Sequence, residues 1–325
     1  MTSMGNNTAA IYLRKSAEDD GTSVSVRFLR HGFPSALRPA LVEPAHIELD
    51  CENTDTPGGV MSDATASDPI LYDVDGHVAT ITTNRPERYN SLNYEAYRLL
   101  TEYFAQADAN PQVRAIIWTG NGRGFCTGDD VKELLGEGAD ELARRIASGE
   151  LELPSGPMLR SETPIIAAVN GPAVGYGMEL ALLADIRVAG TQARFSEMFV
   201  KRAIVAGHDS FELLPRIVGP AAAAEMLLTG DMVDANQALD IGLVSQVVPD
   251  DELIAAAEAL AARIAANAPM AVNAAKQALR LSRDGKGDEL RSYLGRTLGT
   301  LLASNDHQES VAAFLERRDP DYTGS

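Results

Sequence analysis

A regular pattern of hydrophobic and polar positions begins at Ile70. Two β-rich runs, residues 70–74 and 78–83, flank Asp75-Gly76, a dipeptide typical of tight hairpin turns. Asn93 then stands where a helix N-cap is expected. The following apolar residues recur at helical spacing, at Leu99, Leu100, Tyr103, Phe104 and Ala107. The pattern therefore predicts a β-hairpin followed by an amphipathic helix.

Strands and helices alternate from there to about residue 249. Apolar runs at 114–119, 165–169 and 186–189 predict buried strands, and residues 179–183 predict a helix before the last of them. After Ser210 the pattern is mostly helical, with one further strand predicted at 243–248. This order predicts an α/β core over residues 69–249 and a helical section over residues 250–325.

The first 68 residues differ from the rest. They contain scattered Pro, Gly, Ser and Thr without a sustained period, which predicts a poorly ordered extension. Charged residues near the start, such as Arg14 and Lys15, occupy positions where a signal peptide needs an apolar stretch. The chain also has no apolar run of the ~20 residues that a membrane span requires. We therefore expect neither secretion nor membrane insertion.

Composition narrows the possible partners. The 325 residues include 46 acidic and 28 basic ones, for a formal net charge of −18. This charge argues against non-specific binding to nucleic acid or to anionic lipid. Cys51 and Cys126 give no disulfide framework, and the five histidines lack zinc-type spacing. A cytoplasmic protein without a bound metal is expected.

Glycine-rich segments carry the first chemical signal. Residues 120–124 follow the GxGxG pattern rather than GxGxxG, so a tight turn is favoured over a dinucleotide site. The turns at 124–130 and 170–179 each follow an apolar strand, and each is expected to open a helix. Free backbone N–H groups at two such helix starts could form an oxyanion hole for a thioester oxygen. Two ordinary loops are the alternative interpretation.

From about residue 69 to the end, nearly 80% of its length, the chain resembles the enoyl-CoA hydratase/isomerase (crotonase) family. The resemblance rests on six segments in order, residues 83–93, 124–130, 168–179, 214–219, 229–244 and 306–318. It implies a spiral of ββα units followed by helices that assemble a homotrimer or homohexamer. It also implies an acyl-CoA substrate, with coenzyme A as part of the substrate and no separate cofactor.

In this family two backbone N–H groups polarise the thioester carbonyl and stabilise an enolate. The resemblance places them at Thr127 and Tyr176. Tyr176 stands where the family usually has glycine, so its side chain is expected to narrow the acyl pocket. Further substrate contacts are implied on the same two turns, at Cys126, Gly128, Asp130 and Gly175.

The coenzyme A nucleotide is anionic, so positively charged residues are expected beside it. Arg85 and Arg88 lie beside the place where the family binds that nucleotide, although solvated surface charge is an alternative for both. Phe314 and Lys276 are weaker candidates for contacts to the adenine and the phosphates. For these two, ordinary helix packing or a surface position is the favoured interpretation.

Glu179 is the most informative side chain, because it matches one of two glutamates with which family hydratases activate water. The second glutamate position holds Phe199, which can neither accept nor deliver a proton. Glu197 lies two residues earlier and, in an extended segment, would share its face about 6–7 Å away. The direction of the pKa shift of Glu179 stays open, since a helix start favours the anion and burial disfavours it.

A third candidate segment follows at residues 205–212. Gly207 occupies the position of an aspartate that serves as the base in some isomerases of the family, and His208 and Asp209 come directly after it. His208 would titrate near neutrality, and Asp209 could orient it. An N-cap of the next helix is the alternative for Asp209.

Together these features predict an acyl-CoA enzyme that stabilises a thioester enolate. Double-bond isomerisation is favoured over hydration because Phe199 replaces one hydratase glutamate. A non-catalytic acyl-CoA-binding homologue and a hydrolase of the same family are the alternatives.

Overall fold

A computed structural model describes residues 67–134 and 139–325, so the extension predicted at 1–68 lies almost wholly outside the described residues. A six-stranded sheet forms the centre, with the order β1-β2-β3-β4-β6-β9. The β1–β2 hairpin is antiparallel, and every other neighbouring pair is parallel. The strands are β1 (Ile70–Asp75), β2 (Val78–Thr83), β3 (Ala115–Gly120), β4 (Ile165–Val169), β6 (Ile186–Gly190) and β9 (Gln246–Val248).

A second, three-stranded sheet contains β5 (Pro172–Val174), β7 (Arg194–Ser196) and β8 (Val233–Asp234). The β5 strand pairs in parallel with β7, which pairs antiparallel with β8. Directly after β5 comes α4 (Tyr176–Leu183), the helix that carries Glu179. The small sheet therefore sets where α4 begins.

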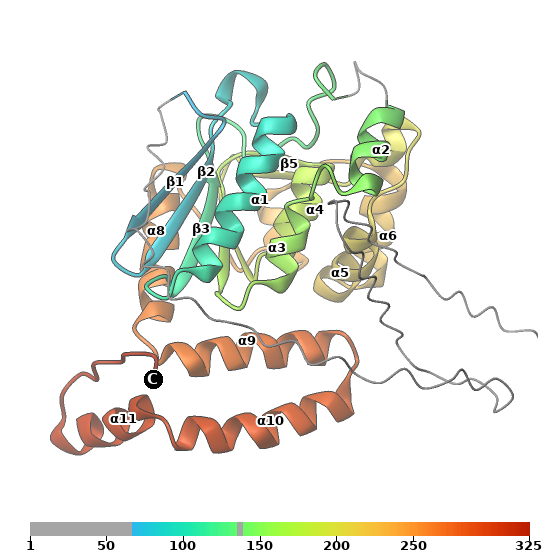
Figure 1. The fold of residues 1–325 in the computed structure, drawn as a ribbon. Coiled ribbons are helices and arrows are strands. Elements are labelled where there is room, and N and C mark those ends of the chain that lie inside the picture. The colour runs from blue at the N-terminus through green and yellow to red at the C-terminus, as the bar shows by residue number, and fades with distance from the viewer. Residues whose placement is uncertain (1–66, 135–138) are drawn as a thin grey trace, which may run out of the picture. The chain divides into compact units, whose positions relative to one another are not determined.

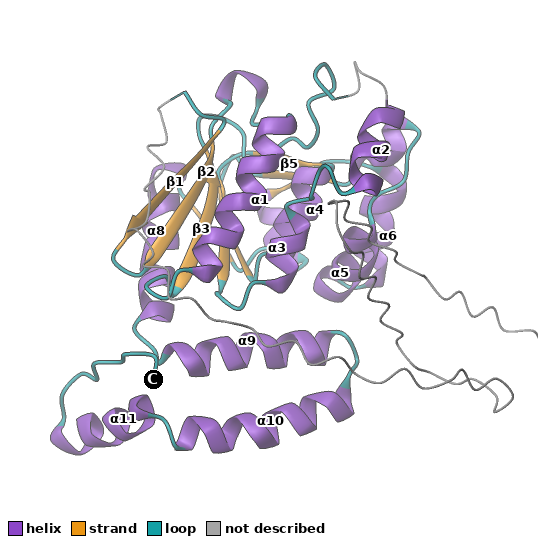
Figure 2. Cartoon of the chain, viewed as in Figure 1, coloured by secondary structure: helices purple, strands orange, loops and turns teal. Residues whose placement is uncertain are grey.

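Both faces of the large sheet are covered, as Figures 1 and 2 show. Ile116 and Trp118 of β3 belong to the main core, which includes α1 (Tyr94–Ala109), α3 (Ser155–Arg160) and α4. The alternate residues Ala115 and Ile117 pack with α8 (Leu253–Ala265) in a separate cluster on the other face. This alternation is the two-residue period of a strand, and it explains why these runs are apolar throughout.

The remaining helices surround this core or extend from it. Lys276 of α9 is 5% exposed, and its Nζ contacts Asp185 Oδ2 at 2.8 Å and Thr163 O at 2.7 Å. This buried ion pair attaches α9 to the core. The other elements are η1 (Pro86–Arg88), α2 (Ala139–Ser148), η2 (Met198–Arg202), α5 (His208–Val218), α6 (Pro220–Thr229), α7 (Ala235–Asp240), η3 (Asp250–Glu252), α9 (Pro269–Arg283), α10 (Gly287–Leu302) and α11 (Asn305–Glu316).

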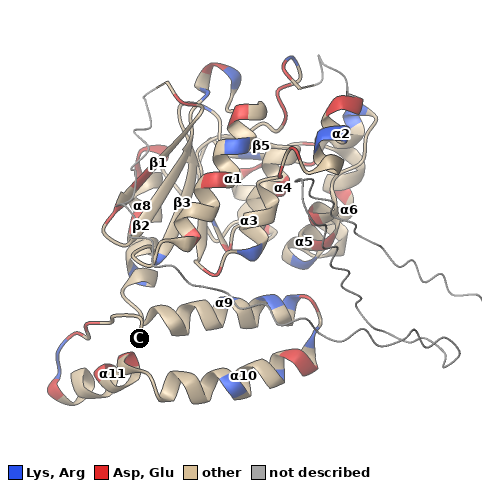
Figure 3. Ribbon diagram, viewed as in Figure 1, with Lys and Arg blue, Asp and Glu red and all other residues tan. Residues whose placement is uncertain are grey.

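The last two helices leave apolar side chains in solvent. The α10 helix contains no buried residue, and Leu298 is 58% exposed. Phe314 of α11 is 83% exposed, and Leu315 beside it is 75% exposed. Figure 3 shows few charged residues on the part of α10 that leads to α11. This surface suits a subunit contact, and the trimer stays a prediction.

Most predicted elements are confirmed. The hairpin, the first helix and the strands at β3, β4 and β6 lie where expected, and Asn93 Oδ1 accepts from Ala96 N at 2.9 Å as the N-cap of α1. The strand predicted at 243–248 is wrong in its first half, because the N–H groups of Leu243 and Val244 bond Ala238 O at the end of α7. No single helix in the described ranges is long and apolar enough to cross a membrane, although the bent pair Asp250–Ala265 and Pro269–Arg283 passes that test by length and composition.

Candidate active site

The turn at 124–130 is fixed by backbone bonds on two sides. Cys126 pairs with β5, donating to Pro172 O at 3.1 Å and accepting from Val174 N at 3.0 Å. On the other side, Leu92 N donates to Gly128 O and Asp130 N donates to Leu92 O, both at 2.8 Å. Successive residues in a paired segment direct their N–H groups to opposite sides. The N–H of Asp129, between Gly128 and Asp130, therefore points away from Leu92.

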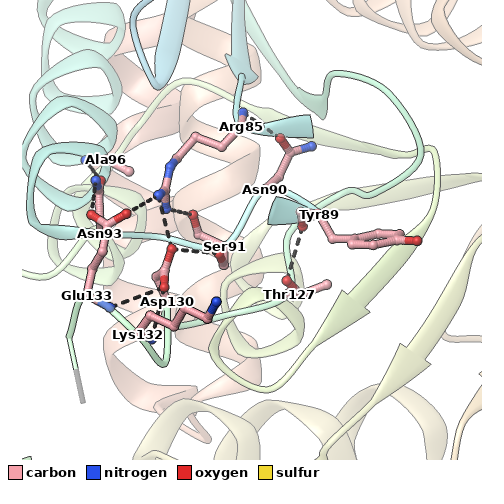
Figure 4. Close-up of polar contacts among 10 residues, drawn as sticks. All are labelled: Arg85, Tyr89, Asn90, Ser91, Asn93, Ala96, Thr127, Asp130, Lys132 and Glu133. Atoms are coloured by element: carbon pink, nitrogen blue, oxygen red, sulfur yellow. Dashed lines mark hydrogen bonds and ion pairs between the residues drawn. The ribbon is translucent and has the colours of Figure 1, made fainter. Parts of the chain in front are cut away.

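Side chains brace this turn from the preceding loop (Figure 4). The Arg85 guanidinium donates to Ser91 O at 2.6 Å and lies 3.0 Å from Asp130 Oδ2 and 2.5 Å from Glu133 Oε1. The Asn90 amide donates to Gly124 O at 2.6 Å. Burial opposes ionisation of Asp130, yet the backbone N–H groups of Glu133 and Lys132 and the Arg85 guanidinium lower its pKa. Arg85 is thus occupied inside the protein.

The helix predicted to open at this turn is wrong within the described residues. Leu134 N donates to Asp130 O at 2.8 Å, which closes a single turn, and the next regular helix begins at Ala139. Asp130 Oδ1 accepts from the N–H groups of Lys132 and Glu133, as an N-cap would.

The turn at 170–177 depends on glycine. A Cβ at Gly171 would lie 2.1 Å from Arg123 O, and one at Gly177 would lie 2.1 Å from Cys126 O. Gly175 has φ +55, and its N–H donates to Ser196 O at 2.9 Å. The missing side chains let the two turns touch. They meet at Gly128, where a Cβ would lie 3.1 Å from Tyr176 N.

Several backbone N–H groups close to this meeting point lack a backbone acceptor. The N–H groups of Asp129 and Tyr176 have no acceptor within residues 67–134 and 139–325. The Thr127 N–H has no backbone acceptor in these ranges either, and the Thr127 hydroxyl donates to Tyr89 O at 3.1 Å. The free N–H groups suit a ligand oxygen that carries negative charge.

The Tyr176 side chain joins an aromatic cluster. Its ring stacks on Tyr97 with centroids 5.6 Å apart, and its hydroxyl lies 3.5 Å from Ser155 Oγ. Tyr97 donates to Asp129 Oδ1 at 2.5 Å. Burial raises the pKa of both the Tyr176 phenol and the Asp129 carboxyl. Whether this cluster narrows an acyl pocket stays a prediction.

Glu179 lies one helical turn after Tyr176 and is 4% exposed. Its Oε2 accepts from Gly207 N at 3.2 Å, at the start of α5. Burial and the nearby charge of Asp209 raise the pKa of Glu179, against the backbone N–H groups of Gly207, Asp209 and Ser210. This settles the direction of the shift. A Cβ at Gly207 would lie 2.1 Å from Glu179 Oε1, so any larger residue there would displace the Glu179 carboxyl.

The structure separates the next two candidates. Gly207 is the N-cap of α5, so the alternative of Asp209 as N-cap is wrong, and Asp209 lies in the first turn. The Asp209 carboxyl is close enough to Glu179 to raise its pKa. The His208 side chain is 81% exposed, with Nδ1 3.6 Å from Asp209 Oδ1 and 3.5 Å from Glu212 Oε2. The Asp209 carboxyl therefore acts electrostatically on Glu179, whereas the His208 side chain faces solvent.

Phe199 and Glu197 do not lie along one strand. The β7 strand ends at Ser196 and η2 follows, so the expected shared face is wrong. The Phe199 ring lies beside Gly175, 3.9 Å from a Cβ placed there. Glu197 is fully buried, with both carboxyl oxygens 3.1 Å from Ser210 Oγ. Burial, with a smaller contribution from the Glu179 charge, raises the pKa of Glu197 to about 8 against the Ser210 hydrogen bond.

The cation candidates also divide. Arg88 is exposed, whereas Lys276 is held by Asp185 in the core. Lys132 is a further exposed cation near the first turn, and the sequence reasoning missed it although a lysine beside a glycine-rich turn was visible. Asn170 was also missed as a brace, and its amide donates to Gly122 O at 2.9 Å and to Gly124 O at 3.1 Å.

Comparison with known proteins now gives the family. The sequence profile of the family described as enoyl-CoA hydratase/isomerase matches residues 73–325. The chain is 41% identical over 258 residues to the (E)-benzylidenesuccinyl-CoA hydratase of Thauera aromatica, covering 79% of this chain and 100% of that one. It is 38% identical over 250 residues to the 2,3-dehydroadipyl-CoA hydratase of Escherichia coli strain K12, covering 76% and 95%.

Solved structures agree with this relationship. The enoyl-CoA hydratase of Bacillus anthracis superposes with a TM-score of 0.75 at 30% identity, covering 79% of this chain and all of that one. The enoyl-CoA hydratase of Mycobacterium tuberculosis gives a TM-score of 0.72 at 35% identity with the same coverage. With the two converging turns and the buried glutamate, these matches show that the chain belongs to the enoyl-CoA hydratase/isomerase family and has its crotonase fold.

Proposed function

We propose that this acyl-CoA enzyme moves a proton between carbons of an enolised thioester, and so isomerises a double bond. One observation carries the proposal. Glu179 is a buried carboxylate with a raised pKa, one helical turn from the free N–H of Tyr176, while Phe199 occupies the second hydratase position. A base with a raised pKa suits removal of a carbon-bound proton.

The two free N–H groups would stabilise the charge that this step creates. We assign them to Asp129 and Tyr176, and thus place the first donor two residues after Thr127, because the pairing of Leu92 directs the Asp129 N–H away from Leu92. In a 3-enoyl-CoA, Glu179 takes a C2 proton, and the thioester oxygen carries the negative charge of the dienolate. Protonation at C4 by the same carboxyl gives the 2-enoyl isomer. Loss of one such donor typically costs about 10²–10³-fold in turnover.

Hydration is the second candidate, favoured by the Asp209 carboxyl beside Glu179 and by the hydratase names of the relatives. Adding water to a 2-enoyl-CoA needs a second group to hold and deprotonate that water. Asp209 would have to replace the glutamate lost at Phe199. The two reactions differ in the position of isotope and in the product.

The test is turnover in D₂O, with products identified by mass spectrometry. A 3-enoyl-CoA should give the 2-enoyl isomer faster than a short 2-enoyl-CoA is hydrated, and the isomer carries deuterium to the extent that the Glu179 carboxyl exchanges its proton with solvent before it protonates C4. Faster hydration would favour the second candidate, and thioester binding without C2 exchange would indicate a non-catalytic homologue. Phe199→Glu should gain hydratase activity where the pocket accepts the charge.

Glu179→Gln keeps the shape of the side chain and removes the base. Turnover should fall about 10²–10⁴-fold with little change in thioester affinity. Glu225→Gln, at an exposed position of α6, is a control for a charge change outside the site. Unaltered turnover in Glu179→Gln would move the chemistry to Asp209 or His208.

We also infer a homotrimer or homohexamer. The exposed apolar residues of α10 and α11, such as Leu298 and Phe314, support this assembly. Sedimentation should show a mass at least three times that of the chain. A stable monomer at micromolar concentration would contradict it.

A further inference from the structure

Arg85 is enclosed by the loop that carries it and by the first turn. Its exposed fraction is 9%, and its guanidinium contacts Ser91 O, Asp130 Oδ2 and Glu133 Oε1 (Figure 4). Two carboxylates and one carbonyl therefore take up its donors and balance its charge. Little positive charge is left for a phosphate, whereas the neighbouring Arg88 is exposed.

The carboxylate that Arg85 holds lies one residue from the donor we assign. Asp130 N donates to Leu92 O, and Leu92 N donates back to Gly128 O, so Asp129 is held between two fixed residues. Gly128 in turn lies close to the second turn, since a Cβ placed on it would be 3.1 Å from Tyr176 N. A displacement of Asp130 would therefore move the Asp129 N–H relative to the Tyr176 N–H. Oxyanion donors act only over a narrow range of distance, so small displacements reduce turnover.

We propose that Arg85 is a positioning residue, which acts through Asp130 to hold the Asp129 N–H against the thioester oxygen. This inference rests on the proposed function, since it needs a thioester oxygen at that point. It replaces the expectation that Arg85 binds coenzyme A. The Arg85–Asp130 ion pair fixes the position of a hydrogen-bond donor. Its removal should therefore lower kcat more than it weakens acyl-CoA binding.

Three variants alter the Arg85–Asp130 ion pair to different extents. Asp130→Asn keeps Oδ1 as acceptor for the Lys132 and Glu133 N–H groups but loses the charge that faces Arg85. Arg85→Met removes all three contacts, and Arg85→Lys keeps the charge without the planar fork. We expect kcat to fall about 10–100-fold in Arg85→Met and in Asp130→Asn, with KM for acyl-CoA within about threefold. Arg85→Lys should restore part of the loss.

A double variant tests whether the two residues act as one unit. Arg85→Met with Asp130→Asn should be no slower than the slower single variant, because both remove the same contact. Arg98→Met is the matched control, since Arg98 pairs with Glu95 and Glu102 on the exposed side of α1. It makes the same charge change away from the turn, and its kcat should equal that of the wild type.

A spectroscopic signature separates positioning from loss of structure. 4-Dimethylaminocinnamoyl-CoA absorbs at longer wavelength when its thioester carbonyl is polarised. The wild type and Arg98→Met should both shift its absorption to the red. Arg85→Met and Asp130→Asn should bind it with a smaller shift.

The results for the variants test the role of Arg85, and the result for the wild type tests the proposed function. A full red shift in Arg85→Met together with a KM raised more than tenfold would show that Arg85 binds coenzyme A, and would overturn the inference alone. Where Arg85→Met fails to fold, wild-type kcat and red shift in both Arg85→Lys and Asp130→Asn would overturn it equally. A folded wild type that neither binds nor shifts the probe would overturn the proposed function itself.

Discussion

The two turns that meet at the candidate site are supported in opposite ways. The first, residues 124–130, is braced by polar side chains, and its Asp130 carboxyl has a lowered pKa beside backbone N–H groups and Arg85. The second, residues 170–177, depends on glycines that admit backbone contact. The strand that pairs with β5 of this turn, β7, is followed directly by the buried acid Glu197, whose pKa is raised to about 8. The first support therefore weakens in acid and the second weakens in alkali.

The largest effect is expected at the second turn. Gly177→Ala places a methyl group 2.1 Å from Cys126 O, so backbone must move. Unfolding free energy should fall by about 3 kcal/mol or more, measured by urea denaturation. Turnover should fall about 100-fold, because the N–H groups separate.

Gly295→Ala in α10 is the matched control, because nothing lies within 4 Å of a Cβ there. It should raise the stability by about 0.5–1 kcal/mol. Equal stability of Gly177→Ala and the wild type would show that the second turn does not depend on its glycines.

A smaller loss is expected when the first turn loses a side-chain brace. Asn90→Ala removes hydrogen bonds to Gly124 O at 2.6 Å and Asn121 O at 2.9 Å, and one from Arg85 N at 2.8 Å. At about 0.5–1.5 kcal/mol each, the unfolding free energy should fall by about 2–4 kcal/mol. Asn121→Ala, which removes one exposed contact to Asn84, should cost less than 1 kcal/mol by the same reasoning. A loss above that of Gly177→Ala would reverse the ranking.

The difference in pKa gives the third prediction. An acid whose folded pKa is raised binds its proton more tightly in the folded state, so stability falls as pH rises between its unfolded pKa, 4.5, and its folded pKa, about 8. Glu197→Gln removes this loss and should be more stable than the wild type at pH 9, on the order of 1–2 kcal/mol. At pH 5 the two should be similar. A thermal melt at both pH values measures this, and identical curves would contradict the prediction.

Asp130 affects stability at the opposite end of the pH range from Glu197. Because its folded pKa is lowered, the stability it contributes is present above its unfolded pKa, 3.8, and is lost as pH falls through the folded value. Asp130→Asn should therefore flatten the acid limb of the stability profile and leave the alkaline limb in place.

The smallest effect is expected at Thr127. Thr127→Val removes one hydrogen bond, to Tyr89 O at 3.1 Å, in a turn that Arg85 and Asn90 already brace. Stability should fall by less than about 1 kcal/mol in the same urea assay. A larger loss would mean that the hydroxyl, rather than the buried side chains, holds the turn.

The sequence predicted the fold where local pattern decides structure. The hairpin and the parallel strands follow from runs of apolar residues, and Glu179 follows from its motif. What could not be predicted depends on distant partners. Arg85 is neutralised by Asp130 and Glu133, more than forty residues later, and nothing near Arg85 in sequence shows this.

The direction of the backbone N–H groups on the first turn could not be predicted from the sequence either. A motif places Thr127 and Asp129 on one turn, but which N–H faces Tyr176 depends on how Leu92 pairs with that turn. Glu197, directly after β7, also has a distant partner, because Ser210 of α5 donates to its carboxyl.

For anyone diversifying this enzyme, Gly207 and His208 form an instructive pair of neighbours. A Cβ at 207 collides with the end of the Glu179 side chain, so a substitution there forces the carboxyl to move, whereas the 208 side chain is 81% exposed and tolerates exchange. A library that randomises 208 together with Phe199 would sample new electrostatics near Glu179 while Glu179 itself stays in place. One that includes 207 would also sample displaced positions of the Glu179 carboxyl.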